Sequence, residues 1–203
     1  MLRLSLHENP EEKIIHKALD VLRAGGVTAY PTESFYGLGV NALDEDALRR
    51  LYELKKRPLD NPVPVIAGSI EVLESIVETI PHEAEDLIKR FWPGALTIVF
   101  DAVDTVPDML TGGTGKIAVR IPGNSFALNL AKTAGFLITA TSANLSGRPP
   151  AQAAEEIIDY FGREIDLIID AGRTPGGKPS TIVDVTVTPV RVLREGSVKV
   201  KLP

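Results

Sequence analysis

The stretch GGVTAYPTESFYGLGVNALDEDALRRLYELKKRPLDNP, residues 25–62, decides the organisation of the chain. Its apolar run at residues 27–30 predicts a strand, which leads into a hydroxyl-rich turn and a return segment spaced by two glycines. Asp44 then predicts the start of an amphipathic helix that ends in three cations at residues 55–57, before Pro58. This order brings hydroxyls and positive charge to one rim of a sheet, where α/β proteins usually bind ligands.

The composition predicts a soluble protein of one domain. The 203 residues are 44% hydrophobic, which is enough for a sizeable core, and cysteine is absent. The absence of cysteine excludes disulfides, thiolate nucleophiles and thiolate metal ligands. No apolar run approaches the ~20 residues that span a bilayer, and the N-terminus lacks a signal-peptide core, so we expect a cytoplasmic protein without a membrane partner. The net charge of −5 disfavours a general nucleic-acid binder, so an anionic ligand needs a local cluster of cations.

Strand and helix patterns alternate early in the chain, and strands follow one another late. Asn9 is the candidate N-cap of a first helix that ends at Gly25. The later predicted helices cover residues 70–77, 81–92, 126–133 and 151–161. The later predicted strands cover residues 63–67, 96–100, 116–121, 136–140, 167–170, 181–187 and 190–193, and the predicted loops cover residues 101–115 and 173–179. This pattern predicts an α/β fold with a mixed parallel and antiparallel sheet.

Two polar clusters belong to the opening stretch. The turn carries Thr32, Ser34 and Tyr36, whose hydroxyls suit an amino acid or a nucleotide sugar, although ordinary turn chemistry with a buried tyrosine accounts for the same residues. The loop after the helix carries Lys55 and Arg57. Lysines at a helix C-terminus often interact only with the helix dipole, but Arg-Pro followed by Asn-Pro restrains the loop, and a restrained guanidinium suits phosphate oxygens.

The third cluster, TSANLSG at residues 141–147, follows a predicted apolar strand. Its small hydroxyls and its amide permit close approach of a ligand to the backbone, and a plain loop with a helix cap has a similar sequence. Single cations occupy predicted strands at Lys116, Arg120 and Arg194. Because Arg120 lies in an otherwise apolar run, where an unpaired guanidinium is costly, an acidic side chain or a ligand carboxylate must pair with it.

Several catalytic patterns are missing from the sequence. The three histidines, His7, His16 and His82, lie outside all three clusters, and no HExxH metal motif occurs. The phosphate-binding motif GxxxxGK[ST] and the nucleophile motif GxSxG are also absent. Catalysis by positioning and charge neutralisation, as in phosphoryl and nucleotidyl transfer, therefore fits the chain best.

Seven motifs together carry a resemblance to a known family. They are PTESFYGLG (31–39), KKRPLDNP (55–62), FWPGALTIVF (91–100), KIAVRIP (116–122), TSANLSG (141–147), PSTIVDVT (179–186) and VLREG (192–196). In number and order they resemble the YrdC-like threonylcarbamoyl-AMP synthase family, in its short form without an additional C-terminal domain. The resemblance implies a single YrdC-like domain over residues 1–203, with its core at about residues 10–197. In that domain helices flank a twisted mixed sheet with a concave cationic groove.

The resemblance implies a nucleotidyltransferase that makes L-threonylcarbamoyl-AMP and pyrophosphate from L-threonine, bicarbonate and ATP, for modification of the tRNA adenosine next to the anticodon. Lys55 and Arg57 match the family's catalytic Lys-x-Arg pair. The implied ATP contacts are Arg57, Asn61, Lys116, Ser142, Asn144 and Arg194, and the implied threonine contacts are Thr32, Ser34, Tyr36, Arg120 and Ser180. No protein metal site is implied, because Mg²⁺ would be carried on the triphosphate. The threonylcarbamoyl transferase machinery is an implied transient partner.

The chain departs from the family pattern at three positions. Ser34 replaces a threonine but keeps the hydroxyl, Ile66 stands where many relatives have a histidine, and Pro150 replaces a frequent serine. Two other functions compete with the synthase. One is a non-catalytic module that binds double-stranded RNA or tRNA, against which the acidic net charge argues. The other is a hydrogenase-maturation paralogue, whose zinc-binding cysteines and additional domains are missing from this sequence.

Overall fold

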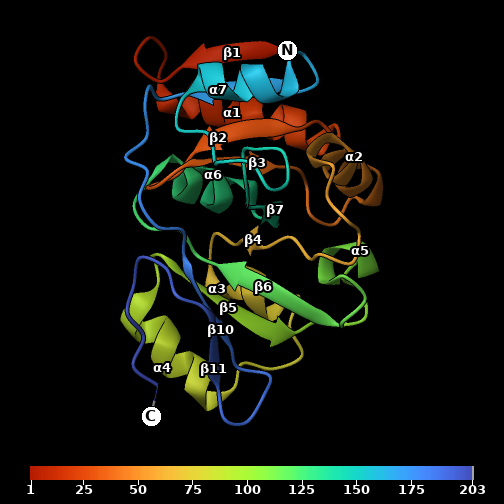
Figure 1. Cartoon of the computed structure of the whole chain (residues 1–203), viewed down its shortest axis with the longest axis vertical. Helices are drawn as coiled ribbons and strands as arrows, with labels where there is room; N and C mark the ends of the chain where they lie inside the picture. Colours follow the sequence, from red (N-terminus) through yellow and green to blue (C-terminus); the bar gives the residue numbers. More distant parts are fainter. Residues whose placement is uncertain (203) are drawn as a thin grey trace.

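The computed structural model describes residues 1–202 and has two β-sheets, one above the other in Figure 1. The first sheet has the strand order β1 (Leu2–Ser5), β9 (Leu167–Asp170), β2 (Thr28–Pro31), β3 (Tyr36–Gly39), β8 (Thr141–Ser142). The second has the order β11 (Arg191–Arg194), β10 (Thr181–Asp184), β5 (Leu96–Asp101), β6 (Lys116–Arg120), β4 (Val65–Ile66), β7 (Ile138–Thr139). Both sheets combine parallel and antiparallel pairs, which confirms the predicted mixed α/β class.

The sequence predicts one sheet, whereas the structure divides the strands between two. The predicted strand at residues 136–140 is the place where the chain changes sheets. β7 pairs with β4 in the second sheet, and β8, which begins two residues later, pairs with β3 in the first. Between them, the backbone N–H of Ala140 donates to Pro64 O at 2.7 Å. This crossing brings the start of the 141–147 cluster to the boundary between the two sheets.

Helices cover both sheets. α1 (Glu11–Arg23), α2 (Glu45–Lys55), α6 (Phe126–Ala134) and α7 (Ala154–Phe161) lie with the first sheet, and α3 (Ile70–Glu74) and α4 (His82–Phe91) lie with the second (Figure 1). A further single turn, α5 (Asp108–Thr111), interrupts the predicted loop at residues 101–115. The larger cluster of buried hydrophobic residues includes strands of both sheets, so one core joins them. Among residues 1–202, no helix is long and apolar enough to cross a bilayer.

Local sequence accounts for the first two helices. α1 forms as predicted because five aliphatic side chains recur at helical spacing and are buried. Its predicted cap is wrong, because Pro10 occupies the cap position and Asn9 Nδ2 instead donates to Ser5 O at 3.1 Å. α2 begins at its predicted cap, where Asp44 Oδ1 accepts a hydrogen bond from the backbone N–H of Ala47 at 3.0 Å.

Besides β8, which lies just past the predicted strand at residues 136–140, two strands were not predicted as strands. The sequence indicates β3 only as a glycine-spaced return, but it pairs antiparallel with β2 along four residues. Glycine is required at Gly39, because a Cβ there would lie 2.7 Å from both Tyr30 Cε1 and Ile138 Cγ2. The other strand, β1, is a short edge strand that pairs in parallel with β9. Its pairing depends on residues about 165 positions away, which local periodicity does not report.

Candidate active site

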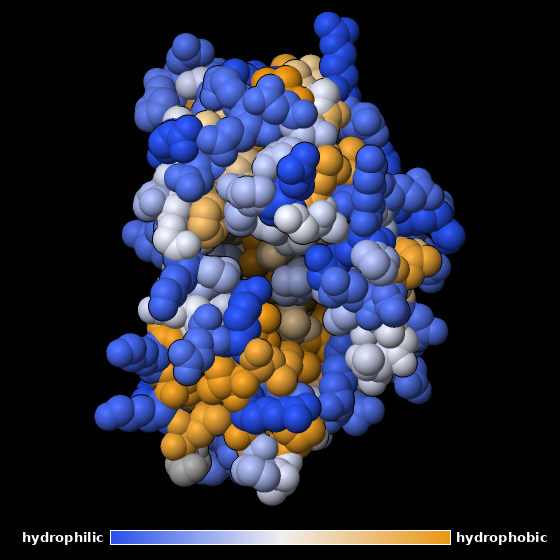
Figure 2. Space-filling view, viewed as in Figure 1, coloured by the Kyte–Doolittle hydropathy of each residue, from blue (hydrophilic) through white to orange (hydrophobic). Residues whose placement is uncertain are grey.

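A cavity of about 450 Å³ takes residues from both sheets. Its walls come from the turn after β2, the loop after α2, the strands β4, β5, β6 and β8, and the segment that leads into β10. Figure 2 shows the surface hollowed at the level where the two sheets meet. Eight of the twelve predicted site residues line this cavity: Thr32, Ser34, Tyr36, Arg57, Arg120, Ser142, Ser180 and Arg194.

The hydroxyl-rich turn lies at the cavity wall, but two of its hydroxyls already have protein partners. Thr32 Oγ1 donates to Phe35 O at 2.7 Å and accepts from the backbone N–H of Ser34 at 3.2 Å, as in an ordinary Ser/Thr turn. The Tyr36 hydroxyl donates to Gly172 O at 2.7 Å, and burial raises the pKa of Tyr36 to about 12. These residues therefore stabilise the turn or the fold and also line the cavity. Of the three hydroxyls, that of Ser34 has the weakest protein contact, at 3.5 Å from Thr32 Oγ1.

Arg57 is held at the cavity by the loop that follows it. The left-handed backbone of Lys56 (φ 52°) ends α2 and turns the chain into this loop. Arg57 Nε donates to Asn61 O at 2.9 Å, and Arg57 Nη2 donates to Asn61 Oδ1 at 2.8 Å and to Pro62 O at 2.9 Å. Partial burial lowers the pKa of Arg57. The expected restraint of the guanidinium is thus present, and Asn61 provides it from outside the cavity lining.

Lys55 points beneath the cavity and does not line it. Its side chain is buried, with the ammonium group donating to Ser142 O at 2.5 Å and to Asn144 O at 2.7 Å. Burial lowers the pKa of Lys55 to about 7, and the nearby charge of Arg57 adds to this decrease. The cation is therefore used inside the protein, where it holds the 141–147 cluster to the end of α2.

Arg194 reaches the cavity from β11. Its Nε and Nη2 atoms donate to Ser180 O at 3.1 and 2.9 Å, and Nη2 also donates to Ser180 Oγ at 3.2 Å. Ser180 Oγ lies 2.8 Å from Thr97 Oγ1 on β5. This chain of contacts fixes Arg194 to the second sheet, while partial desolvation lowers the pKa of the guanidinium.

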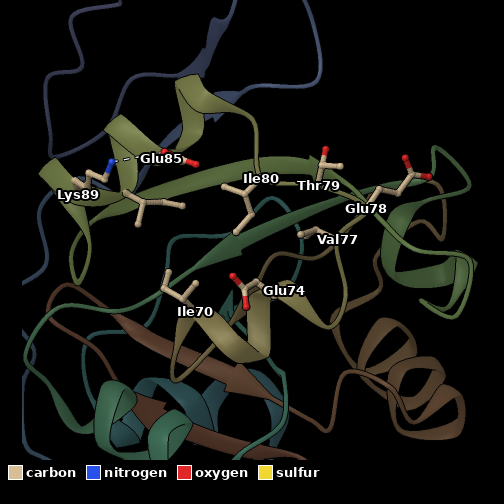
Figure 3. Close-up of a pocket in the computed structure, with 9 residues that line it drawn as sticks. Ile70, Glu74, Val77, Glu78, Thr79, Ile80, Glu85 and Lys89 are labelled. Carbon is tan, nitrogen blue, oxygen red and sulfur yellow. Dashed lines mark ion pairs between the residues drawn. The ribbon is translucent and has the colours of Figure 1, made fainter.

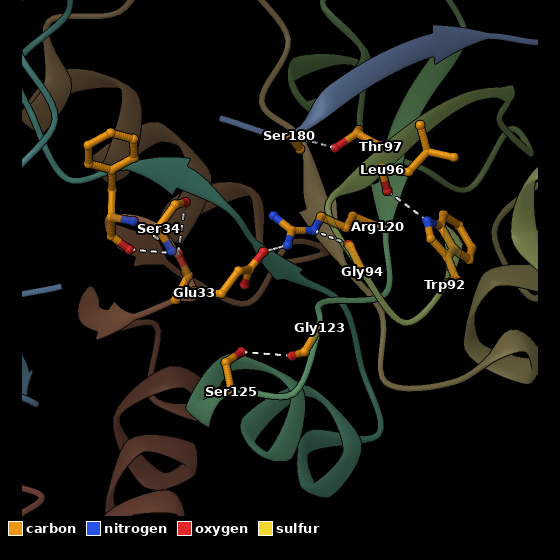
Figure 4. A network of polar contacts seen from close by, with 12 residues as sticks. Glu33, Ser34, Trp92, Gly94, Leu96, Thr97, Arg120, Gly123, Ser125 and Ser180 are labelled. Carbon is orange, nitrogen blue, oxygen red and sulfur yellow. Dashed lines mark hydrogen bonds and ion pairs between the residues drawn. The ribbon is translucent and has the colours of Figure 1, made fainter. Parts of the chain in front are cut away.

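Arg120, at the end of β6, pairs with an acidic side chain, as one of the two sequence-based alternatives predicts. Its Nε donates to Gly94 O at 2.7 Å, and its Nη2 forms an ion pair with Glu33 from the turn after β2 (Figure 4). Burial lowers the pKa of Arg120 to about 10, so the guanidinium stays charged at neutral pH. The pair connects the two sheets across the cavity.

The structure leaves four predicted contact residues outside the cavity lining: Lys55, Asn61, Lys116 and Asn144. Lys116 lies at the opposite end of β6 from Arg120, where its ammonium group donates to Thr186 Oγ1. Because four steps along a strand span about 13 Å, Lys116 is remote from Arg120. Asn144 is only 7% exposed, and its side chain accepts from Ser142 Oγ and donates to Arg148 O.

Several cavity residues were not predicted, and their sequence signals differ. Glu33 lies inside the PTESFYG motif between two predicted contacts, so the motif itself was the available signal. Thr97 on β5 lies inside the FWPGALTIVF motif, so there too the motif was the available signal. Ile66 and Pro150, the two departures with different side-chain chemistry, both line the cavity. The departures therefore change the cavity wall itself.

A second cavity, of about 430 Å³, lies between α3 and α4 (Figure 3). Its lining is aliphatic and acidic, with Glu74, Glu78 and Glu85 against a single cation, Lys89, which lies 3.6 Å from Glu85. The first cavity has the opposite balance, with three arginines and one glutamate. Because an acidic lining repels phosphates and carboxylates, the first cavity is the candidate site for anionic ligands.

The fold and the site together define a class: mixed α/β proteins with a cavity between two sheets that is lined by arginines and hydroxyls. Within that class the chain belongs to the Sua5/YciO/YrdC family, whose sequence profile, described as "Telomere recombination", matches residues 20–196. The chain is similar to the threonylcarbamoyl-AMP synthase of Pyrococcus abyssi, with 44% identity over 95% of this chain and 57% of the relative. It thus spans little more than half the length of that relative.

Two solved structures have the same fold. The first is the P. abyssi Sua5 protein complexed with L-threonine, with a TM-score of 0.89 and 44% identity over 96% of this chain and 57% of that one. The second is Escherichia coli YciO, with a TM-score of 0.84 and 30% identity over 98% of this chain and 96% of that one. The predicted family is therefore confirmed.

Proposed function

We propose that the chain is a nucleotidyltransferase that makes L-threonylcarbamoyl-AMP and pyrophosphate from L-threonine, bicarbonate and ATP. One observation carries the proposal: Arg57, Arg120 and Arg194, from three distant segments, line one cavity together with a set of hydroxyls. Such a lining suits a triphosphate beside an amino-acid carboxylate. The name of the P. abyssi relative and the threonine complex of the P. abyssi protein support the same assignment.

The reaction needs charge neutralisation more than covalent catalysis. Threonine and bicarbonate combine into a carbamate with loss of water. A carbamate oxygen then attacks the α-phosphorus of ATP, and the bond from that phosphorus to the bridging oxygen breaks as pyrophosphate leaves in line. In this proposal Arg57 and Arg194 bind phosphate oxygens, and Arg120 binds the threonine carboxylate. The hydroxyls of Ser34 and Ser180 complete the contacts, and Ser142, whose hydroxyl donates to Asn144, lines the cavity beside them. Lys55, Asn61 and Asn144 support these residues from behind, and Lys116 is omitted from the site.

A divalent cation belongs to the proposal as part of the nucleotide. The described residues contain no group of three or more His, Asp or Glu side chains suited to hold a metal ion, and the single acid in the cavity lining is paired with Arg120. In this proposal Mg²⁺ is carried on the triphosphate with several of its waters. Bound there, it supplies charge neutralisation to the leaving pyrophosphate.

The wider biological role is also a proposal. The product would serve the threonylcarbamoyl modification of tRNA adenosine next to the anticodon, in the cytoplasm, with transfer by a separate enzyme. We further propose that residues 1–203 act as one YrdC-like domain, for which the core shared by the two sheets is the support.

The proposal is tested by incubating the protein with ATP, L-threonine, bicarbonate and Mg²⁺ and measuring pyrophosphate. We expect release that requires all three substrates and is abolished by EDTA. Arg57→Ala should reduce it by about 100-fold or more, whereas Arg49→Ala, on the exposed face of α2, should not change it. Absence of threonine-dependent release with any divalent metal contradicts the proposal. Salt-sensitive tRNA binding without turnover would instead support the RNA-binding alternative.

A further inference from the structure

Glu33 carries the one acidic side chain in the cavity lining among residues 1–202. It lies in the turn between β2 and β3, opposite Arg120 at the end of β6 (Figure 4). A cavity that takes anions gains nothing from a carboxylate unless that carboxylate has a cation to bind. In this structure that cation is Arg120, and the question is which cation Glu33 binds when a substrate carboxylate takes Arg120.

The ion pair between Glu33 and Arg120 is largely shielded from water. The Arg120 side chain is 12% exposed and the Glu33 side chain is 29% exposed. Glu33 Oε2 is buried and has no hydrogen-bond partner among the described residues. A shielded carboxylate with an unused oxygen is held less favourably than a fully hydrogen-bonded one. The carboxylate thus has capacity left for a further donor.

The two charges match the head group of an α-amino acid. A zwitterion carries its carboxylate and its ammonium group next to each other, and the internal pair presents a guanidinium next to a carboxylate. We propose that Glu33 binds the α-ammonium group of the amino-acid substrate while Arg120 binds its α-carboxylate, so that the zwitterion replaces the internal ion pair. This inference rests on the proposed function, and it adds a substrate-selecting residue to the cavity.

The exchange explains how the site selects an amino acid over a simple carboxylate. Binding of a zwitterion breaks one ion pair and forms two, so both protein charges remain paired. A carboxylate without an amine also separates Glu33 from Arg120, but it leaves Glu33 without a cation. Because an uncompensated buried charge is strongly unfavourable, such a ligand is rejected. Removing the charge of Glu33 should therefore reduce the preference of the site for the zwitterion over the simple carboxylate.

Calorimetric titration of the wild-type protein and of Glu33→Gln with two ligands tests this inference. The ligands are L-threonine and its hydroxy-acid analogue, in which a hydroxyl replaces the amine. For Glu33→Gln we expect the preference for threonine over the hydroxy acid to fall by about tenfold or more, because the charged contact to the amine is lost. The hydroxy acid should bind more tightly to Glu33→Gln than to the wild type, since no internal ion pair has to be broken.

The controls separate this role from a structural one and from the proposed function. Glu78→Gln, in the second cavity, should leave both affinities unchanged, and ATP binding with an unaltered melting temperature shows that Glu33→Gln is folded. If both ligands lose affinity equally in Glu33→Gln, or if neither affinity changes, the inference is overturned while threonine binding still stands. If the wild-type protein binds no threonine, the proposed function fails and this inference fails with it.

Discussion

Lys55 Nζ donates a hydrogen bond to Ser142 O at 2.5 Å, although the two residues are 87 positions apart in the chain. The bond connects the last turn of α2 to the start of the 141–147 cluster, and Ser142 itself lines the cavity. Lys55 therefore contributes to the candidate site indirectly, by positioning Ser142. Sequence motifs associate this lysine with phosphate contact. In this structure its ammonium group instead holds Ser142, a residue of the cavity lining, in place.

We first predict that Lys55→Met lowers the free energy of unfolding by about 2 kcal/mol at pH 9. Methionine has a similar length but no donor, so the carbonyl oxygens of Ser142 and Asn144 lose a hydrogen bond inside the protein. Urea denaturation monitored by circular dichroism measures the change. Lys56→Met is the matched control, because that neighbouring side chain is exposed, and it should stay within about 0.5 kcal/mol of wild type. Equal losses in both variants would contradict the buried role.

The second prediction concerns pH. Burial lowers the pKa of Lys55 from 10.5 to about 7 in the folded protein. Between these two values the unfolded chain binds more protons at this residue than the folded protein does, so the contribution of Lys55 to stability increases with pH. From pH 7 to pH 9, the stability of wild type relative to Lys55→Met should rise by about 2 kcal/mol. Parallel denaturation series at several pH values measure this difference, and a constant difference would argue against the lowered pKa.

Third, Arg57→Lys should impair catalysis despite the retained charge. Lysine lacks the planar fork that donates to Asn61 and Pro62, so its ammonium group would not be held at the cavity wall. We expect the KM for ATP in the pyrophosphate-release assay to rise by about tenfold or more, with threonine affinity little changed. Arg49→Lys on the exposed face of α2 serves as the control. An unchanged KM for ATP would remove Arg57 from the proposed phosphate contacts.

Fourth, Gly68→Ala should destabilise the fold by about 1–3 kcal/mol. A Cβ at Gly68 would lie 2.5 Å from Ala131 O and 2.6 Å from Lys132 Cα, both backbone atoms of α6 that cannot yield easily. Gly123→Ala is the comparison, because its nearest contact would be an ordinary 3.7 Å to Gly94 Cα. Thermal denaturation of the two variants tests the pair, and similar melting temperatures would show that α6 can move away from Gly68.

Local elements were predictable because their signals are local. The helix α2 follows from Asp44 and a repeating apolar face, and α6 ends at Gly135, whose backbone is left-handed (φ 68°). The strands β10 and β11 also follow from two neighbouring runs with strand-like alternation. The change of sheet at Ala140 was not predictable, because an apolar run of five residues reports burial but not which strand lies beside it.

The residues of the candidate site were likewise predictable, but their pairings were not. The motifs marked Arg57, Arg120 and Arg194 as candidates, and all three line one cavity. Periodicity and motif order could not tell that Glu33 pairs with Arg120, or that Lys55 turns inward. Such pairings depend on which side chains meet across the two sheets, and that information is spread over residues far apart in the chain.

By itself, the sequence determined the class of fold, most of the helices and strands, and the family, because these depend on short-range patterns and on the order of motifs. Only the tertiary structure decided which cations face the cavity and which are used inside the protein. The physical reason is that a charged side chain has to be paired or solvated, and the available partners exist only once both sheets are assembled. Lys55 finds backbone oxygens inside the protein, whereas Arg57, Arg194 and Arg120, the last paired with Glu33, all line the cavity.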